Sequence, residues 1–135
     1  GTLFPYTTLF RSVIMRFDYD EATGALGKPS VLIDSASEPG IPDGMTVDAE
    51  GCIWSARWDG GCLVRYSPAG EELQRVTFLA RKVSCVTFGG EGQRDMYVTT
   101  AGGQDKTAEG EGAGCLYRLS VATRGLPEFL SRVGP

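Results

Sequence analysis

Leu63-Val64-Arg65-Tyr66 has two close copies elsewhere in the chain, Ile14-Met15-Arg16-Phe17 and Leu116-Tyr117-Arg118-Leu119. Each copy is followed by a turn and then by another short apolar segment, and two such segments precede the second and third copies. The copies are spaced by about 50 residues, which corresponds to a unit of four short strands. Such a repeating unit is typical of a β-propeller blade, because the strands of a sandwich do not recur as a unit. A β-meander whose segments are similar by coincidence is the alternative.

The segments around these copies have the period-two apolar pattern of strands, and Gly, Pro and Asp residues separate them. Glycine makes up 19 of the 135 residues, as in turn-rich β proteins, and no stretch has the apolar stripe of an amphipathic helix. We therefore predict an all-β fold of about two and a half four-stranded blades. The expected strands are 13–17, 30–33, 45–47, 53–56, 62–66, 73–79, 83–88, 96–100, 115–119 and 126–130.

An open stack of blades leaves unpaired faces at both ends, so we expect the chain either to belong to something longer or to self-associate through its open blade edges.

The composition excludes several kinds of function. The chain has no histidine and no asparagine, so it lacks an imidazole base, an imidazole metal ligand and an Asn amide ligand. With 13 Lys and Arg against 17 Asp and Glu, the net charge is −4, which argues against a nucleic-acid or membrane partner. No apolar segment is long enough to cross a bilayer and none resembles a secretory signal, so we expect a soluble, cytoplasmic protein.

Four cysteines stand at positions 52, 62, 85 and 115, without a CxxC pair. Each lies in or beside an apolar strand-like segment, where a free cysteine behaves as a small hydrophobic residue. We expect reduced, buried thiols, with two disulfides as the alternative.

Three motifs suggest functions that the sequence does not support. Trp58-Asp59 lacks the upstream Gly-His of a WD repeat. The segment 18–24 has Ala and Thr where a calcium-binding EF-hand loop needs an oxygen ligand and a glycine, so we expect a hairpin turn there. Ser84-Cys85 has no base to activate a nucleophile, and we place it on a strand in the core.

Two other segments are candidates for function. In Gly40-Ile41-Pro42-Asp43-Gly44-Met45, Pro42 and Gly44 predict a tight turn just before an innermost strand, which would hold the Asp43 carboxylate at the mouth of a propeller channel. A carboxylate there could bind a cation or act as a general base, whereas an ordinary Asx turn is the simpler interpretation. The polar segment 102–114 is either a lid over the channel or a solvated loop.

Several motifs in order resemble the SMP-30/gluconolactonase/LRE-like family, which includes regucalcin and bacterial sugar lactonases. The resemblance covers residues from about 12 to 130 and implies a six-bladed β-propeller that hydrolyses sugar lactones with a divalent cation, usually Ca²⁺ or Zn²⁺. The motifs are Pro42-Asp43-Gly44-Met45-Thr46-Val47-Asp48-Ala49-Glu50-Gly51, Ile53-Trp54, Gly60-Gly61, Val64-Arg65-Tyr66, Ser84-Cys85-Val86-Thr87-Phe88-Gly89-Gly90 and Met96-Tyr97-Val98-Thr99-Thr100-Ala101, with Phe17-Asp18-Tyr19-Asp20 and Thr23-Gly24 ahead of them.

The resemblance also implies a metal site built from one Glu, two Asn and the Asp of the Pro-Asp-Gly-Met motif. Only that Asp maps onto this chain, as Asp43, which would then be both a metal ligand and the catalytic base for the attacking water. Residues 1–11 match nothing in the family and are interpreted as foreign sequence. Residues 12–135 are interpreted as the C-terminal portion of the propeller.

We therefore expect the C-terminal fragment of a metal-dependent sugar lactonase, whose partner is a small sugar lactone. Because a hard cation needs about 6–8 oxygen ligands in the case of Ca²⁺, we expect metal binding by this chain to be weak or absent, and the chain alone to be nearly inactive. The alternatives are a non-catalytic propeller module for binding or assembly, and a metal-independent relative similar to the strictosidine-synthase propellers. The Pro-Asp-Gly-Met motif argues against the latter.

Overall fold

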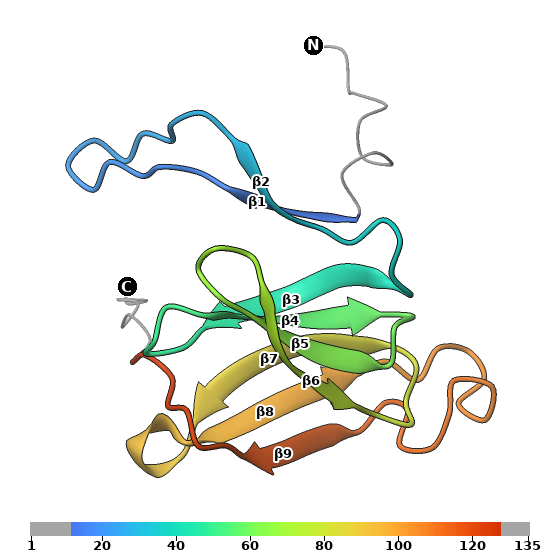
Figure 1. The fold of residues 1–135 in the computed structure, drawn as a ribbon. Coiled ribbons are helices and arrows are strands. Elements are labelled where there is room, and N and C mark those ends of the chain that lie inside the picture. The colour runs from blue at the N-terminus through green and yellow to red at the C-terminus, as the bar shows by residue number, and fades with distance from the viewer. Residues whose placement is uncertain (1–11, 128–135) are drawn as a thin grey trace, which may run out of the picture.

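A computed structural model describes residues 12–127, which form nine strands and one short 3₁₀ turn. All three sheets are antiparallel, and their order follows the chain: β1-β2, then β3-β4-β5-β6, then β7-β8-β9 (Figure 1). The all-β class is confirmed, and the second sheet is the four-stranded meander predicted from the repeat. The elements are β1 (Val13–Arg16), β2 (Ser30–Asp34), β3 (Ile41–Val47), β4 (Ile53–Trp58), β5 (Cys62–Tyr66), β6 (Glu72–Thr77), β7 (Val83–Gly89), η2 (Glu91–Gln93), β8 (Asp95–Thr100) and β9 (Leu116–Ser120).

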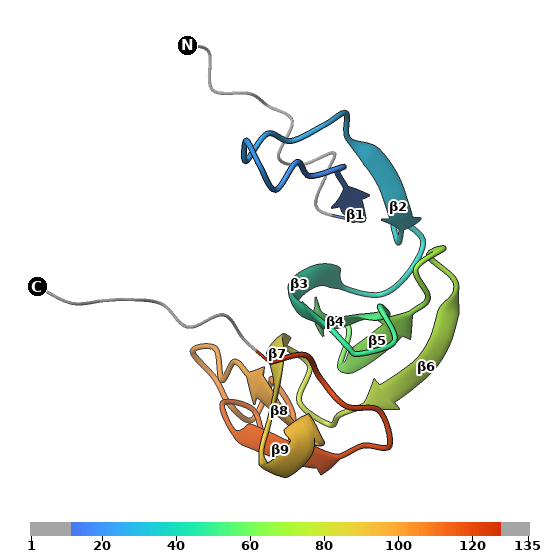
Figure 2. The ribbon, with the colours of Figure 1, turned by 90° about the vertical axis from the view of Figure 1, so that its left-hand side faces the viewer.

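The sheets pack face to face, and the first strands of the second and third sheets come together. β7 contacts both β3 and β4, and the end-on view shows β6 on the far side of its sheet from β7 (Figure 2). The second and third sheets thus each have an inner edge, where β3 and β7 meet, and an outer edge formed by the last strand, β6 or β9.

The segment after β9 departs from the prediction of a further strand at 126–130. Leu126 and Pro127 lie outside any strand, and the remaining three residues lie outside the described part of the chain. Instead of running along β9, the chain returns to the turn after β3: Gly125 forms an isolated bridge with Asp48, and the Ala49 amide donates to the Arg124 carbonyl over 2.9 Å. The outer edge of β9 is therefore unpaired within residues 12–127.

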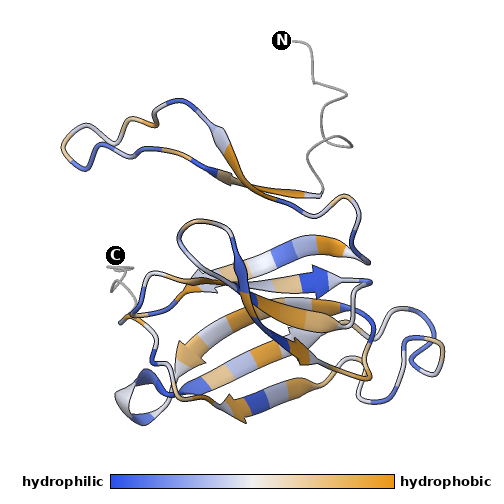
Figure 3. Cartoon of the chain, in the orientation of Figure 1, coloured by the Kyte–Doolittle hydropathy of each residue, from blue (hydrophilic) through white to orange (hydrophobic). Residues whose placement is uncertain are grey.

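Two apolar clusters hold the three sheets together, and the apolar stripes of Figure 3 follow the strands that form them. Period-two alternation explains this, because alternate residues of a strand point to opposite faces of its sheet: in β5, Leu63 joins one cluster, whereas Cys62 and Val64 join the other. One cluster joins the second and third sheets and the other joins the first and second. The first contains Trp54, Ala56, Leu63, Val83, Val86, Phe88, Met96 and Val98, and the second contains Ile14, Ile33, Cys62, Val64 and Tyr66.

A buried carboxylate, Asp48, closes the turn between β3 and β4. Its Oδ1 accepts hydrogen bonds from the Glu50 and Cys52 amides, at 2.9 and 3.0 Å. Its Oδ2 accepts from Trp54 Nε1 over 3.0 Å and from Arg65 Nε over 2.8 Å. Four donors thus bind this fully buried carboxylate, which compensates the loss of hydration.

The arginine of the repeated motif has the same partner type in both larger sheets. Arg65 binds Asp48 in the second sheet, and Arg118 NH2 lies 2.7 Å from Asp95 Oδ2 in the third. The repeat therefore includes an intrasheet ion pair as well as an apolar pattern.

The segment 18–24 is the predicted hairpin turn. The Asp20 carboxylate accepts hydrogen bonds from the Ala22 and Thr23 amides, and Tyr19 forms a bridge with Leu26. In the part of the chain that the structure describes, no helix is long and apolar enough to cross a membrane.

All four cysteines are free, as predicted, but only Cys52 and Cys62 are buried. Cys85 and Cys115 are exposed, so the prediction of four buried thiols, and of a core position for Cys85, is wrong at these two sites. The reason for Cys85 is the alternation along β7, where Val86 and Phe88 take the buried face.

Thiol labelling distinguishes the two pairs. Burial raises the pKa of the Cys52 and Cys62 thiols and shields them from reagent, whereas Cys85 and Cys115 are open to it. With iodoacetamide at pH 8, we expect two thiols to be modified quickly and two only after denaturation. The Cys85→Ser, Cys115→Ser double variant should lose the fast phase, and four equally fast thiols would contradict this arrangement.

Candidate functional site

Asp43 lies inside β3, within an irregularity of the strand. Pro42 pairs with Arg57 and Met45 with Ser55, and the register shifts between them, so that Asp43 and Gly44 form a bulge. The predicted tight turn before the strand is therefore wrong: β3 already begins at Ile41. A bulge reorients the side chain that it carries, and the Asp43 side chain is exposed.

Gly44 is required by the approach of the neighbouring sheet. A Cβ added there would lie 2.5 Å from Cys85 Sγ and 2.8 Å from Cys85 Cα, closer than real Cβ contacts. β3 and β7 therefore come together at this point, and the Asp43 backbone is held between β4 on one side and β7 on the other.

Replacing Gly44 with alanine tests this contact. The new methyl group meets backbone as well as side-chain atoms of Cys85, so β3 and β7 must separate, and we expect a loss of about 2–3 kcal/mol of unfolding free energy. Chemical denaturation monitored by circular dichroism measures it. Cys85→Ala is the control, since it removes only an exposed thiol and should cost less than about 0.5 kcal/mol. Equal stability of Gly44→Ala and wild type would contradict the contact.

The segment 102–114 lies at the same end of the sheets as Asp43. Since the strands are antiparallel, β3 and β7 begin at the end where β4 and β8 finish, and Figure 1 shows the loop after β8 on that side. The turn after β4 is also there, and its Asp59 has a left-handed φ of 60°.

Ion pairs and hydrogen bonds fix this segment to its surroundings. Lys82 binds the Glu109 carboxylate and lies 3.4 Å from Asp59, and the Arg81 amide donates to the Glu109 carbonyl over 2.8 Å. The hydrogen bond that the Lys82 ammonium donates to the Glu109 carboxylate raises the pKa of Lys82. Thr100 Oγ1 also binds the Gly112 carbonyl at 3.1 Å. The segment is therefore anchored at several points, while residues 103–108 are exposed.

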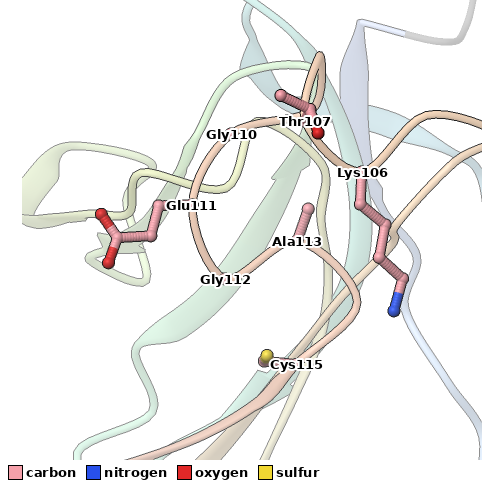
Figure 4. Close-up of a pocket in the computed structure, with 7 residues that line it drawn as sticks. All are labelled: Lys106, Thr107, Gly110, Glu111, Gly112, Ala113 and Cys115. Carbon is pink, nitrogen blue, oxygen red and sulfur yellow. The ribbon is translucent and has the colours of Figure 1, made fainter.

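An open hollow of about 510 Å³ is formed within this segment (Figure 4). The Lys106 and Glu111 side chains point to different sides of it, and Cys115 lies at its base. Lys106 and Glu111 thus do not converge on one point of the hollow, although both are among its lining residues. The residues are Lys106, Thr107, Gly110, Glu111, Gly112, Ala113 and Cys115.

The described residues do not make a cation site by themselves. Among residues 12–127, no group of three or more His, Cys, Asp or Glu side chains could hold a metal ion. Asp43 is thus a single exposed carboxylate, and one carboxylate with water does not bind a hard divalent cation tightly. What Asp43 offers chemically is one acceptor that could take a proton or join ligands supplied from elsewhere.

Comparison with known proteins identifies the family. The protein-family model described as the SMP-30/gluconolactonase/LRE-like region matches residues 2–102 of this chain. The chain belongs to this family. The family match starts at residue 2, whereas the resemblance based on motifs starts at about residue 12. Residues 1–11 lie outside the described part of the chain, and their interpretation as foreign sequence stays a prediction.

Individual family members are similar over most of this chain. A pentonolactonase, XacC, from Haloferax volcanii is 47% identical over 137 residues, covering 96% of this chain and 47% of the relative. Regucalcin from Danio rerio is 33% identical, covering 94% of this chain and 45% of the relative. The solved structure of a calcium-binding regucalcin from Agrobacterium tumefaciens superposes with a TM-score of 0.82 at 33% identity, covering 91% of this chain and 43% of the other. This family member thus spans about half the length of its relatives.

The family motifs do not include the residues that form charged contacts in the segment just before Asp43. Glu38 and Ser35, in the connection between β2 and β3, contact Arg57 of β4 and Arg75 of β6. These partners are 19 to 37 residues apart in sequence, so only the fold brings them together. Arg57 stands out in the sequence only as the one charged residue of β4, which does not say which carboxylate it meets.

Proposed function

We propose that this chain is part of a six-bladed β-propeller sugar lactonase that depends on a divalent cation, Ca²⁺ or Zn²⁺. Family membership supports the fold and the reaction class, and the 47% identical relative named pentonolactonase supports a sugar lactone as substrate. The observation that carries the proposal is the placement of Asp43. Its exposed carboxylate lies on a bulge of an inner strand, in the Pro-Asp-Gly-Met segment of the family match.

The chemistry assigned to Asp43 is that of a general base. Water attacks the lactone carbonyl carbon and Asp43 accepts a proton from that water. The ring C–O bond then breaks, and the leaving ring oxygen takes this proton from Asp43 to give the hydroxyl group of the hydroxy acid. In this proposal Asp43 is also one ligand of the cation, and the other ligands come from parts of the propeller outside this chain. The 135-residue chain alone is therefore nearly inactive.

A chimera provides the test. Residues 12–135 replace the matching part of the H. volcanii pentonolactonase, where 47% identity favours compatible contacts between sheets. We expect the chimera to hydrolyse a five-carbon sugar lactone, to lose activity with EDTA and to regain it with Ca²⁺ or Zn²⁺. The separate 135-residue chain should show less than about 1% of that rate, because proximity and charge stabilisation are incomplete. Robust metal-stimulated hydrolysis by the separate chain would contradict the assignment of ligands outside it.

A non-catalytic assembly module is the second candidate function. The outer edge of β9, which is unpaired within residues 12–127, favours it, together with Leu79 and Leu116, which are 72% and 65% exposed. Unpaired strand edges are sites where another chain adds. Light scattering after size exclusion should then show an oligomer of the 135-residue chain, and a monodisperse monomer would rule this candidate out. The cytoplasmic location stays a prediction.

A further inference from the structure

The connection between β2 and β3 leads directly into the strand that carries Asp43. Two arginines bind this connection through a single carboxylate, that of Glu38. We propose that Glu38, bound by Arg57 and Arg75, is a positioning residue that fixes the start of β3 and thereby the Asp43 carboxylate. This inference rests on the proposed function for its effect on catalysis, whereas its structural part stands on the contacts alone.

Arg57 is the buried centre of these contacts. Its side chain is 0% exposed, and its two terminal nitrogens donate to Ser35 Oγ, at 2.5 Å, and to the Tyr66 hydroxyl. Both of these partners are neutral. In the described residues its only carboxylate within ion-pair distance is Glu38, whose Oε2 lies 3.8 Å from NH2. The charge of a buried guanidinium needs such a partner, because desolvation is costly without one.

Arg75 binds the same oxygen from the outer strand. Its NH2 lies 2.7 Å from Glu38 Oε2 and 2.6 Å from Glu72 Oε2, so it is shared between the connection and its own strand. Glu38 Oε2 therefore joins a fully buried cation on β4 to a partly exposed cation on β6. The connection cannot shift along the sheet without breaking both contacts.

The chain between Glu38 and Asp43 has little freedom to absorb such a shift. Gly40 has a left-handed φ of 75°, and a Cβ on it would lie 2.5 Å from the Trp58 carbonyl oxygen, so the backbones touch there. Pro42 pairs with Arg57 in the β3–β4 ladder. Arg57 thus holds the connection through its side chain and the residue before Asp43 through its backbone.

Glu38→Gln is the test, because glutamine keeps the shape and removes the charge. Glu72→Gln is the matched control, because it removes the other carboxylate that pairs with Arg75. The Glu72 carboxylate forms no hydrogen bond or ion pair with residues 35–43 in the described structure. Hydrogen exchange of the 135-residue chain reports the local structure. Steady-state kinetics of the lactonase chimera report the effect on catalysis, with Asp43→Asn measured alongside.

With Glu38→Gln, we expect amides of residues 36–45 to exchange at least 10-fold faster, with β8 and β9 unchanged. In the chimera, kcat per folded enzyme should fall at least 10-fold while KM for the lactone changes less than 2-fold. Because a general loss of stability also lowers the apparent kcat at constant KM, the rate is normalised to the folded fraction measured by circular dichroism. Glu72→Gln should change neither exchange in 36–45 nor kcat by more than 2-fold.

Unchanged exchange in residues 36–45, or faster exchange throughout the chain, would overturn the positioning role in any case. So would an unchanged kcat of Glu38→Gln in a chimera that Asp43→Asn inactivates. Full turnover by the Asp43→Asn chimera would instead reject the proposed function, and the exchange data would still decide whether Glu38 fixes the start of β3.

Discussion

Asp43→Asn is expected to lower kcat of the lactonase chimera at least 100-fold, because a general base contributes about 10²–10⁴-fold and the amide can neither accept the proton nor supply a charge to the cation. The lactone KM should change little, since the substitution is isosteric and leaves the bulge of β3 intact. Initial rates over a range of lactone concentrations, at saturating metal, measure both constants.

Asp20→Asn is the matched control for this substitution. Asp20 is an exposed aspartate whose carboxylate accepts hydrogen bonds in the β1–β2 hairpin turn, which an asparagine preserves. We expect its chimera to keep wild-type kcat within 2-fold. If Asp43→Asn also keeps wild-type turnover, Asp43 is neither base nor ligand.

Asp48→Ala is expected to reduce the unfolding free energy by about 3–5 kcal/mol, the range for breaking a buried ion pair by removing one partner. The change leaves Arg65 Nε, Trp54 Nε1 and the Cys52 amide without their acceptor in the core between β3, β4 and β5. Urea denaturation of the 135-residue chain measures it.

Glu50→Gln tests whether burial makes the difference. Glu50 also pairs with Arg65, at 2.9 Å, but its side chain is 64% exposed. An exposed pair contributes about 0–1 kcal/mol, so we expect a loss below that limit. A loss of under about 1 kcal/mol for Asp48→Ala as well would show that the four hydrogen bonds to its carboxylate contribute no more than the exposed pair.

The strands were predictable because period-two alternation and turn residues are local signals. Nine expected strands agree with β1 to β9 to within a few residues at each end. The start of β3 was not predictable, because Pro42 and Gly44 are typical of turns when only neighbouring residues are considered. Here Gly44 serves the close approach of Cys85 from the next sheet, and Pro42 has a backbone partner, Arg57, on β4. Both facts depend on sheet packing.

The charged groups around the candidate site show the same limit. Asp48 lies between the expected strands 45–47 and 53–56, in the turn that joins β3 to β4, but its burial depends on Arg65, 17 residues away. The contact of Glu38 with Arg75 spans 37 residues. For Asp48, the arginine of the repeated motif was a usable signal, because Arg118 likewise binds a carboxylate in its own sheet. For Glu38, no local sequence pattern predicted the contact with Arg75.

The central claim is that Asp43 ligates a divalent cation in the assembled propeller, and the crystal structure of the metal-loaded chimera, with anomalous diffraction data collected for the metal, tests it most directly. Zn²⁺ serves for this measurement because of its strong anomalous signal. The proposal predicts an anomalous peak at the β3 bulge with an Asp43 carboxylate oxygen about 2.0–2.2 Å from the ion. A cation bound in the active chimera with both Asp43 oxygens more than about 4 Å away would contradict it.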